Sequence, residues 1–279
     1  MHDIYAFSDI HGMWDLYRAI MDYCHEQDED AMIIFCGDAC DRGPAGYQIM
    51  KELLDNPKVV YLKGNHEDMF CKAAREIKEN FSFDGVDRER VRHILNTCMV
   101  FDYRYPEIQN ALGNGGIDTL TDWVMDGKPL DIVERLEALP YTFSTDTCDF
   151  CHAAGVYKVF ERVSDAEYNG FPIDPYDANS IIWSRGAFNY TWAQNRTCIF
   201  GHTPVPYLLE DLKIKRTEEN IVRPYKYIGT FGNTNGTKID MDTGAAFLKY
   251  AWVLNCLTMK AQGFRLENDI VKKIECIQM

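Results

Sequence analysis

The sequence predicts an α/β protein of the α+β type, in which two facing mixed β-sheets form a β-sandwich flanked by helices. Three observations support this fold class. Apolar strand patterns alternate with helical patterns over the first 70 residues, helical patterns prevail between Met69 and Pro140, and strand patterns return after Tyr141. No linker rich in Pro, Gly or Ser divides the 279 residues. We therefore expect one domain over residues 1–279, with a helical insertion at about 70–140.

The first part of the chain predicts a parallel sheet. Three short apolar runs have the β-branched character of strands that are buried on both faces, and two segments of helical pattern lie between them. We predict strands at Ile4–Phe7, Ala31–Cys36 and Val59–Leu62, and helices at Trp14–Tyr23 and Gly46–Leu54. Sites in such sheets lie at the carboxyl ends of the strands, so the segments that follow these strands should converge in space.

The later part of the chain predicts a second sheet behind the insertion. Helical patterns at Asp87–Leu95 and Ile132–Leu139 belong to the insertion. We then predict strands of a second, largely antiparallel sheet at Tyr225–Phe231, Lys238–Met241, Ala246–Leu257 and Phe264–Ile274. The polar stretch Leu208–Asn220 is predicted to be an exposed loop near His202.

Polar strings follow each of the first three predicted strands. They are Asp9-Ile10-His11, Gly37-Asp38-Ala39-Cys40-Asp41-Arg42-Gly43 and Gly64-Asn65-His66-Glu67. Hard divalent ions prefer carboxylate oxygen and imidazole nitrogen, and two ions about 3.5 to 4 Å apart need one bridging carboxylate. We interpret the strings as half of a two-metal phosphoesterase site in which Asp38 is the bridge.

These strings resemble the calcineurin-like metallophosphoesterases, and the Asp-Arg-Gly and Asn-His-Glu endings narrow the resemblance to the phosphoprotein phosphatase branch. Cys151-His152-Ala153-Ala154-Gly155 and Phe200-Gly201-His202-Thr203-Pro204 are similar to two further family motifs that supply imidazoles. Three more strings are similar to those of bacterial and phage members of the lambda phosphatase type, namely Asn114-Gly115-Gly116, Trp183-Ser184-Arg185 and Asp242-Thr243-Gly244-Ala245. The resemblance covers most of the chain and implies the metallophosphoesterase fold.

The resemblance also implies roles for individual residues. One metal would be held by Asp9, His11, Asp38 and His202, and the other by Asp38, Asn65 and His152. A hydroxide between the two metals would attack phosphorus directly and in line. His66 would be the general acid, with Asp41 as its orienting partner, and Arg42 and Arg185 would bind the phosphate oxygens. Two divalent ions are expected as cofactors; manganese is favoured, and iron or zinc suits the same ligands.

Three functions are compatible with these motifs. The first is a metal-dependent phosphomonoester hydrolase, specifically a serine/threonine-type protein phosphatase. The second is a symmetrical dinucleoside tetraphosphate hydrolase, and the third is a non-catalytic scaffold on the same fold. Relatives that split dinucleoside tetraphosphates typically lack an acid at the Asp41 position and carry Asp where Glu67 stands. Scaffolds tend to lose the acid or the arginines, whereas His66, Arg42 and Arg185 are present. The first function is therefore favoured.

The cysteines offer two competing interpretations, which we reject. Cys36 and Arg42, like Cys98 and Arg104, have the Cys-x5-Arg spacing of cysteine-dependent phosphatases, but carboxylates interrupt the first loop and the second contains no glycine. Cys148 and Cys151 precede His152 in a haem-attachment pattern, which would require export. Ten cysteines without an export signal favour a cytoplasmic protein.

Composition limits the expected partners. No apolar run approaches 18 residues, so no membrane span is expected. The formal charge of −14 opposes binding to a nucleic-acid backbone. It does not oppose a phosphorylated substrate, because metals and arginines reverse the charge locally. The expected partner is a phosphorylated protein or a small phosphomonoester.

Overall fold

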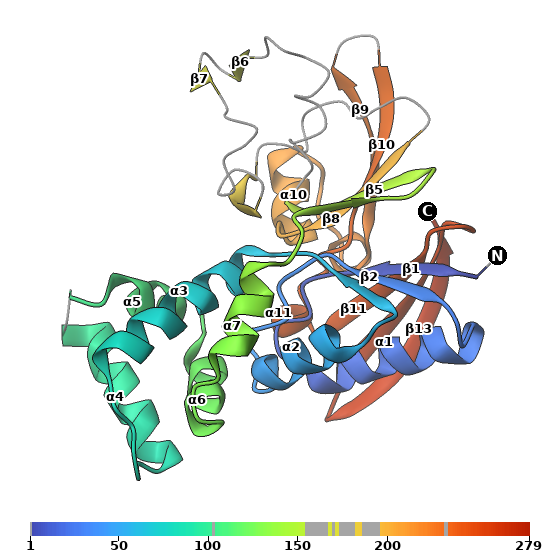
Figure 1. The fold of residues 1–279 in the computed structure, drawn as a ribbon. Coiled ribbons are helices and arrows are strands. Elements are labelled where there is room, and N and C mark those ends of the chain that lie inside the picture. Colours follow the sequence, from blue (N-terminus) through green and yellow to red (C-terminus); the bar gives the residue numbers. More distant parts are fainter. Residues whose placement is uncertain are drawn as a thin grey trace.

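Two β-sheets packed face to face form the centre of the protein, and most helices lie outside them (Figure 1). The computed structural model describes residues 2–101, 104–153, 167–168, 171–172, 182–185, 196–231 and 234–279. Both sheets are mixed, which confirms the predicted fold class.

The first sheet has the strand order β13-β12-β11-β1-β2-β3. Its parallel part confirms the prediction for the start of the chain: β1 (Ile4–Phe7), β2 (Met32–Phe35) and β3 (Val59–Tyr61) are joined through α1 (Trp14–Gln27) and α2 (Gly46–Asp55). Successive side chains of a strand point to opposite faces of the sheet. In β2, Ile34 therefore packs between the two sheets, whereas Phe35 packs in the other hydrophobic core, with α1 and α2. Burial on both faces explains why these strands are continuous apolar runs.

The second sheet has the strand order β4-β5-β8-β10-β9. Its strands are β4 (Thr142–Ser144), β5 (Cys148–Ala153), β8 (Thr197–Gly201), β10 (Thr234–Asp240) and β9 (Tyr225–Phe231). The three central strands run parallel, and only β4 and β9 at the edges pair antiparallel. The prediction of a largely antiparallel second sheet was therefore wrong. Outside this sheet, β6 (Glu167–Tyr168) and β7 (Phe171–Pro172) pair with each other.

The last three strands, which were predicted for the second sheet, belong to the first. β11 (Tyr250–Asn255) pairs antiparallel with β1, and β12 (Lys260–Glu267) and β13 (Ile270–Gln278) continue the sheet. The physical reason is that β1 would otherwise leave one row of backbone N–H and C=O groups unpaired inside the protein. Residues Asn268 and Asp269, both with positive φ, form the turn between β12 and β13. That turn divides the predicted strand Phe264–Ile274 in two.

Helices fill most of the chain between β3 and β4. They are α3 (Asn65–Asn80), α4 (Arg88–Phe101), α5 (Pro106–Gly113), α6 (Ile117–Met125) and α7 (Leu130–Glu137). Helices α4, α5 and α6 lie to one side of the sheets (Figure 1). The helical patterns predicted at Asp87–Leu95 and Ile132–Leu139 correspond to α4 and α7. The single-domain organisation stays a prediction.

Two short helices occupy segments that were predicted differently. Helix α10 (Val205–Asp211) replaces the start of the predicted loop Leu208–Asn220, and its first turn contains Pro206, which favours a helix start. A 3-10 turn follows at Asn220–Val222. Helix α11 (Ala245–Leu248) occupies the start of the predicted strand Ala246–Leu257, and it ends at Lys249 with a positive φ.

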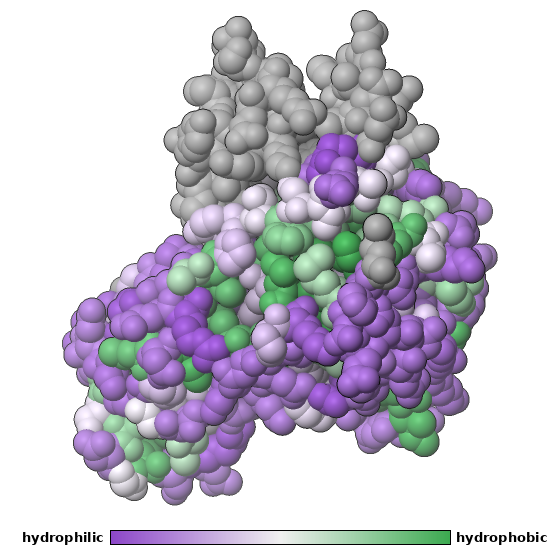
Figure 2. Space-filling view, turned by 45° about the vertical axis from the view of Figure 1, so that its right-hand side comes forward, coloured by the Kyte–Doolittle hydropathy of each residue, from purple (hydrophilic) through white to green (hydrophobic). Residues whose placement is uncertain are grey.

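The surface in the face shown by Figure 2 is hydrophilic over most of its described area, with apolar residues gathered near the centre. Within the residues that the structure describes, no helix is both long and apolar enough to cross a membrane.

Candidate metal centre

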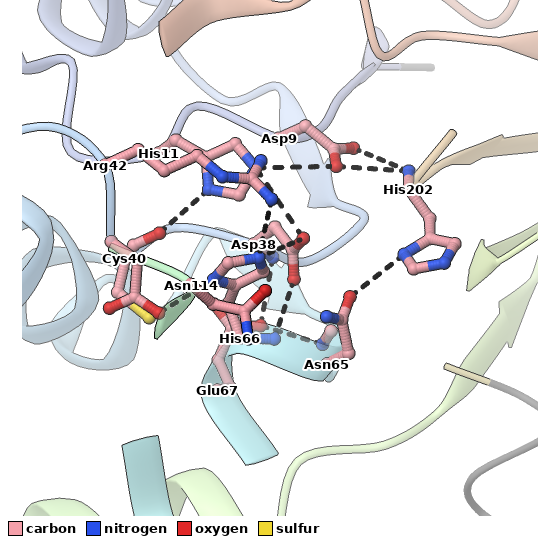
Figure 3. A network of polar contacts seen from close by, with 12 residues as sticks. Asp9, His11, Asp38, Cys40, Arg42, Asn65, His66, Glu67, Asn114 and His202 are labelled. Atoms are coloured by element: carbon pink, nitrogen blue, oxygen red, sulfur yellow. Dashed lines mark hydrogen bonds and ion pairs between the residues drawn. The ribbon is translucent and has the colours of Figure 1, made fainter. Parts of the chain in front are cut away.

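The residues predicted for the site meet at one edge of the two sheets, where several strands end (Figure 3). Asp9 and His11 follow β1, Asp38 follows β2, and Asn65 and His66 begin α3 after β3. The second sheet adds His152 from β5 and His202, which follows β8. The expected convergence of strand ends is therefore observed, although these residues are up to 193 positions apart in the chain.

Strained backbone marks the same edge. Asp9, His11, Asp38 and His202 all have positive φ values between 46° and 69°, and so do Asp41 and Arg42. Non-glycine residues rarely adopt this conformation, and they persist in it where the surrounding structure fixes them, often at functional sites. Here the strain turns each side chain toward a common point. Gly201 serves the same purpose, because a Cβ at this position would overlap the Asp9 carboxylate.

Asn65, His152 and His202 direct three lone pairs at one another. The His152 Nδ1 atom donates to the Cys36 carbonyl at 2.8 Å, so Nε2 is left as the acceptor; it lies 3.0 Å from Asn65 Oδ1. In the same way, His202 Nε2 donates to the Trp183 carbonyl at 3.1 Å, and its Nδ1 lies 2.9 Å from Asn65 Oδ1. Acceptors that face acceptors repel each other unless a cation lies between them. These atoms, with Asp38 Oδ1 at 3.3 Å from His152 Nε2, fit a divalent ion.

His11 forms the equivalent cluster on the other side of Asp38. Its Nδ1 donates to the Cys40 carbonyl at 2.9 Å. Its Nε2 therefore carries the lone pair, which accepts a hydrogen bond from Arg42 Nη1 and lies 3.7 Å from Asp38 Oδ2 and 4.0 Å from Asp9 Oδ1. Asp38 thus offers one oxygen to each cluster, as a bridging ligand must. The ligands divide differently from the sequence-based expectation in one respect: the His202 imidazole lies with His152 and Asn65, and His202 contacts Asp9 only through its backbone N–H.

Burial shapes the charge of both clusters. It lowers the pKa of the His152 imidazole to about 3 and holds the pKa values of His11 and His202 well below their ordinary value, so all three rings are neutral ligands at pH 7. Burial also raises the pKa of Asp9 and of Asp38, and neighbouring carboxylates, Asp242 and Glu67 respectively, add to the rise. Bound cations would relieve this repulsion, so the protonation chemistry of the donor set also fits divalent metals.

Glu67 is a functional residue that sequence reasoning did not assign a role. It is completely buried, and its two carboxylate oxygens accept four hydrogen bonds of 2.7–2.9 Å. The donors are the backbone N–H groups of Asp38, Ala39 and Gly64 and the hydroxyl of Tyr61. Glu67 therefore fixes the turn that aims the Asp38 carboxylate. The available signal was its place three residues after Gly64, where a capping glutamate reaches back to the start of a helix.

His66 has a different environment from the three neutral imidazoles. Its Nδ1 atom lies 2.7 Å from Asp41 Oδ2, and both side chains are buried. Its Nε2 atom faces the site, 3.8 Å from Asp38 Oδ2 and 2.9 Å from Arg42 Nη2. The backbone N–H of Asp41 is in turn held by Thr119 Oγ1 at 3.1 Å. A carboxylate-oriented imidazole whose Nε2 faces the site can serve as a general acid when that nitrogen carries a proton in place of the contact with Arg42.

The two predicted arginines also reach the cluster. The Arg42 guanidinium contacts His11 and His66. Arg185 Nη1 donates to the His202 carbonyl at 3.3 Å. Every residue predicted for the site is thus in contact with another member. By contrast, Cys36 is fully buried between the sheets and burial raises the pKa of its thiol, which opposes a nucleophilic role.

Residues 2–206 match the family model of the calcineurin-like phosphoesterases. The chain belongs to the calcineurin-like phosphoesterase family. This phosphoesterase therefore comes from a family of metal-dependent hydrolases, and the clusters around Asp38 provide ligands for metal. Among curated proteins, none matches its sequence.

Three solved structures are among those similar to this chain. A candidate diadenosine tetraphosphatase is 11% identical, with 98% of this chain and 93% of that chain covered and a TM-score of 0.48. A cold-active protein-tyrosine phosphatase of a psychrophilic Shewanella is 15% identical, with coverage of 99% and 81% and a TM-score of 0.44. A protein serine/threonine phosphatase from Saccharomyces cerevisiae is 13% identical, with coverage of 100% and 81% and a TM-score of 0.38.

Proposed function

We propose that this phosphoesterase is a metal-dependent phosphomonoester hydrolase, specifically a serine/threonine-type protein phosphatase. The observation that carries the proposal is the Asp41–His66 pair, whose Nδ1–Oδ2 distance is 2.7 Å and which lies beside a carboxylate that two metal-ligand clusters share. Hydrolysis of an alkyl phosphate needs a proton for the poor leaving group, and a paired His66 is placed to donate it.

The ligand clusters and the two arginines have different proposed roles. Two divalent ions, for which we propose manganese, would be held by Asp9, His11 and Asp38 on one side and by Asp38, Asn65, His152 and His202 on the other. When bound, such ions lower the pKa of water and neutralise phosphate charge. Arg42 and Arg185 would present planar forks to the non-bridging phosphate oxygens, a geometry that lysine lacks.

The same residues favour a monoester over a dinucleoside polyphosphate. A monoester presents three terminal oxygens to two arginines and two cations, whereas an internal anhydride has fewer free oxygens and two bulky arms. Asp41 and Glu67 also follow the protein phosphatase pattern. The formal charge of −14 supports a phosphorylated protein, rather than nucleic acid, as the partner.

The test compares substrates under one set of conditions. With manganese at fixed pH, kcat/KM for a phosphoserine or phosphothreonine peptide should exceed that for diadenosine tetraphosphate by about tenfold or more, which needs only about 1.4 kcal/mol of differential transition-state binding. Arg185→Ala should erase much of this margin. A dinucleotide that reacts faster than the peptides would contradict the proposal and favour a dinucleoside tetraphosphate hydrolase, and absence of turnover on both would favour the scaffold.

A further inference from the structure

Arg42 has to hold a defined position if it is to bind phosphate, yet its side chain is exposed. A long, exposed arginine samples many rotamers, and each interaction that restricts it before the ligand arrives reduces what binding must order. The structure contains supports at both ends of this residue. The first comes from the string Asn114-Gly115-Gly116, and the second follows the string Asp242-Thr243-Gly244-Ala245; the proposed chemistry uses neither string.

The first support holds the backbone of Arg42. Its N–H donates to the Gly115 carbonyl at 3.0 Å. Gly115 has a φ of +93°, and a Cβ there would stand 3.0 Å from the Arg42 nitrogen, so glycine is required for this close approach. The left-handed conformation of Arg42, with a φ of 65°, is therefore fixed from outside its own loop.

The second support is the ring of Phe247 against the guanidinium. The Arg42 Cζ atom lies 5.2 Å from the centroid of this ring, within the range of a cation–π interaction. The same guanidinium contacts His11 and His66 through its two Nη atoms. Phe247 is 63% exposed, so hydrophobic burial does not explain an aromatic residue at this position.

Phe247 stands on a short helix whose start is tightly fixed. Asp242 Oδ1 accepts the N–H of Gly244 at 3.0 Å, and Gly244 adopts a φ of +75°. The Thr243 hydroxyl donates to the Tyr250 carbonyl at 3.1 Å, and Gly244 accepts the N–H of Phe247 at 3.0 Å. The string that resembles bacterial and phage phosphatases thus presents the ring of Phe247 on a defined turn.

We infer that Phe247 is a positioning residue, which keeps the Arg42 guanidinium beside the site by a cation–π interaction, where it can bind the phosphoryl group of the substrate. The inference rests on the proposed function, since the anion concerned is the phosphate of a monoester. It adds a residue whose effect reaches the substrate only through Arg42.

The test distinguishes the cation–π interaction of the Phe247 ring from the effect of its apolar volume. Phe247→Leu keeps an apolar side chain but removes the π face, whereas Phe247→Tyr and Phe247→Trp keep it. We expect the leucine variant to raise both KM for a phosphopeptide and the dissociation constant of inorganic phosphate by about three- to tenfold, with kcat within about twofold. The two aromatic variants should stay close to the wild type. Calorimetry on the manganese-loaded protein measures phosphate binding independently of turnover.

Two controls make the result specific. Ile270→Ala removes a side chain of similar exposure, 62%, from the start of β13 and should change neither constant. In the Arg42→Ala background, Phe247→Leu should no longer change the phosphate dissociation constant, because the ring acts through the arginine. The inference is wrong if the leucine variant binds phosphate as tightly as the wild type, or if the tyrosine and tryptophan variants lose as much affinity as leucine. A wild type that binds phosphate but hydrolyses no monoester would contradict the proposed function alone.

Discussion

Asn65 and His66 are neighbours in the chain but face different chemistry. Asn65 Oδ1 meets two neutral imidazoles, at 3.0 Å from His152 and 2.9 Å from His202, whereas His66 Nδ1 meets the Asp41 carboxylate. The first turn of α3 makes this possible, since successive residues there point about 100° apart around the helix axis. Two adjacent positions in one helical turn would thus separate the proposed metal binding from the proposed proton transfer.

The first prediction tests this separation. His66→Asn should lower kcat about a hundredfold or more for alkyl phosphates, because general acid catalysis contributes about 10² to 10⁴ in rate. Aryl phosphates, whose leaving groups need less protonation, should lose less, and the metal content should not change. Steady-state kinetics on both substrate classes, with metal analysis of the same samples, gives the answer. Asp41→Asn should show a milder form of the same pattern, and an equal loss for both substrate classes would exclude His66 as the proton donor.

Asp38 is the subject of the second prediction. Because its two carboxylate oxygens face different clusters, Asp38→Asn should reduce both the rate and the amount of metal that remains bound after desalting. Elemental analysis per mole of chain measures the second quantity. A variant that retains the wild-type metal stoichiometry would remove Asp38 from its bridging position.

The convergence of the predicted site residues followed from the sequence, whereas their division between the two clusters did not, and their roles stay predictions. Short strings after three strands place side chains suited to hard metals at one sheet edge, and this placement depends only on neighbouring residues in the sequence. Whether His202 lies beside His11 or beside His152 depends on how the two sheets pack together. No short sequence motif contains that information. The role of Glu67 was missed for a related reason: three of the four groups that donate to it, those of Asp38, Ala39 and Tyr61, lie outside its own helix start.

At the scale of elements, prediction succeeded where burial is complete on both faces. The β1 strand was predicted with its observed bounds, Ile4–Phe7, because an uninterrupted apolar run has few alternatives. It failed where pairing is long-range: β11 was assigned to the wrong sheet because its partner, β1, lies at the other end of the chain. The residue pair Asn268–Asp269 is typical of a hairpin turn, but we overlooked it because the residues on both sides have a strand pattern.

Strand β10 carries a buried lysine, and this gives the third prediction. Burial lowers the pKa of Lys238 to about 8, against a smaller opposing effect of Cys198 and Cys151. Between pH 8 and the ordinary value near 10.5, the unfolded chain binds a proton that the folded one does not, so this residue makes the protein less stable as pH falls through that window. Below pH 8 both states bind the proton and the penalty is constant.

Lys238→Met should therefore be most favourable at neutral pH. The free energy of unfolding of the variant, minus that of the wild type, should decrease by up to about 3 kcal/mol as pH rises from 7.5 to 10.5. Urea titrations of both proteins at matched pH measure this difference, in which the ionisation of groups remote from Lys238 cancels. A difference that stays flat across the window would show that Lys238 keeps an ordinary pKa.

At the scale of the molecule, two sheets and their docking create a single site from distant segments. Ligands from β1, β2 and β3 meet those from β5 and β8 at one edge, and β11 to β13 close the other side of β1. The family match ends at residue 206, so the C-terminal strands and the α11 segment with Phe247 lie beyond it. The proposed chemistry of this phosphoesterase depends above all on two divalent ions.

The most direct measurement is the rate of phosphopeptide hydrolysis as a function of bound metal. The purified protein is treated with excess chelator, desalted, and titrated with manganese while rate and metal content are followed together. We predict loss of turnover in chelator and recovery that is complete at two manganese ions per chain, with magnesium far less effective. Full activity in excess chelator, or recovery that is complete at one ion per chain, would contradict the two-metal account.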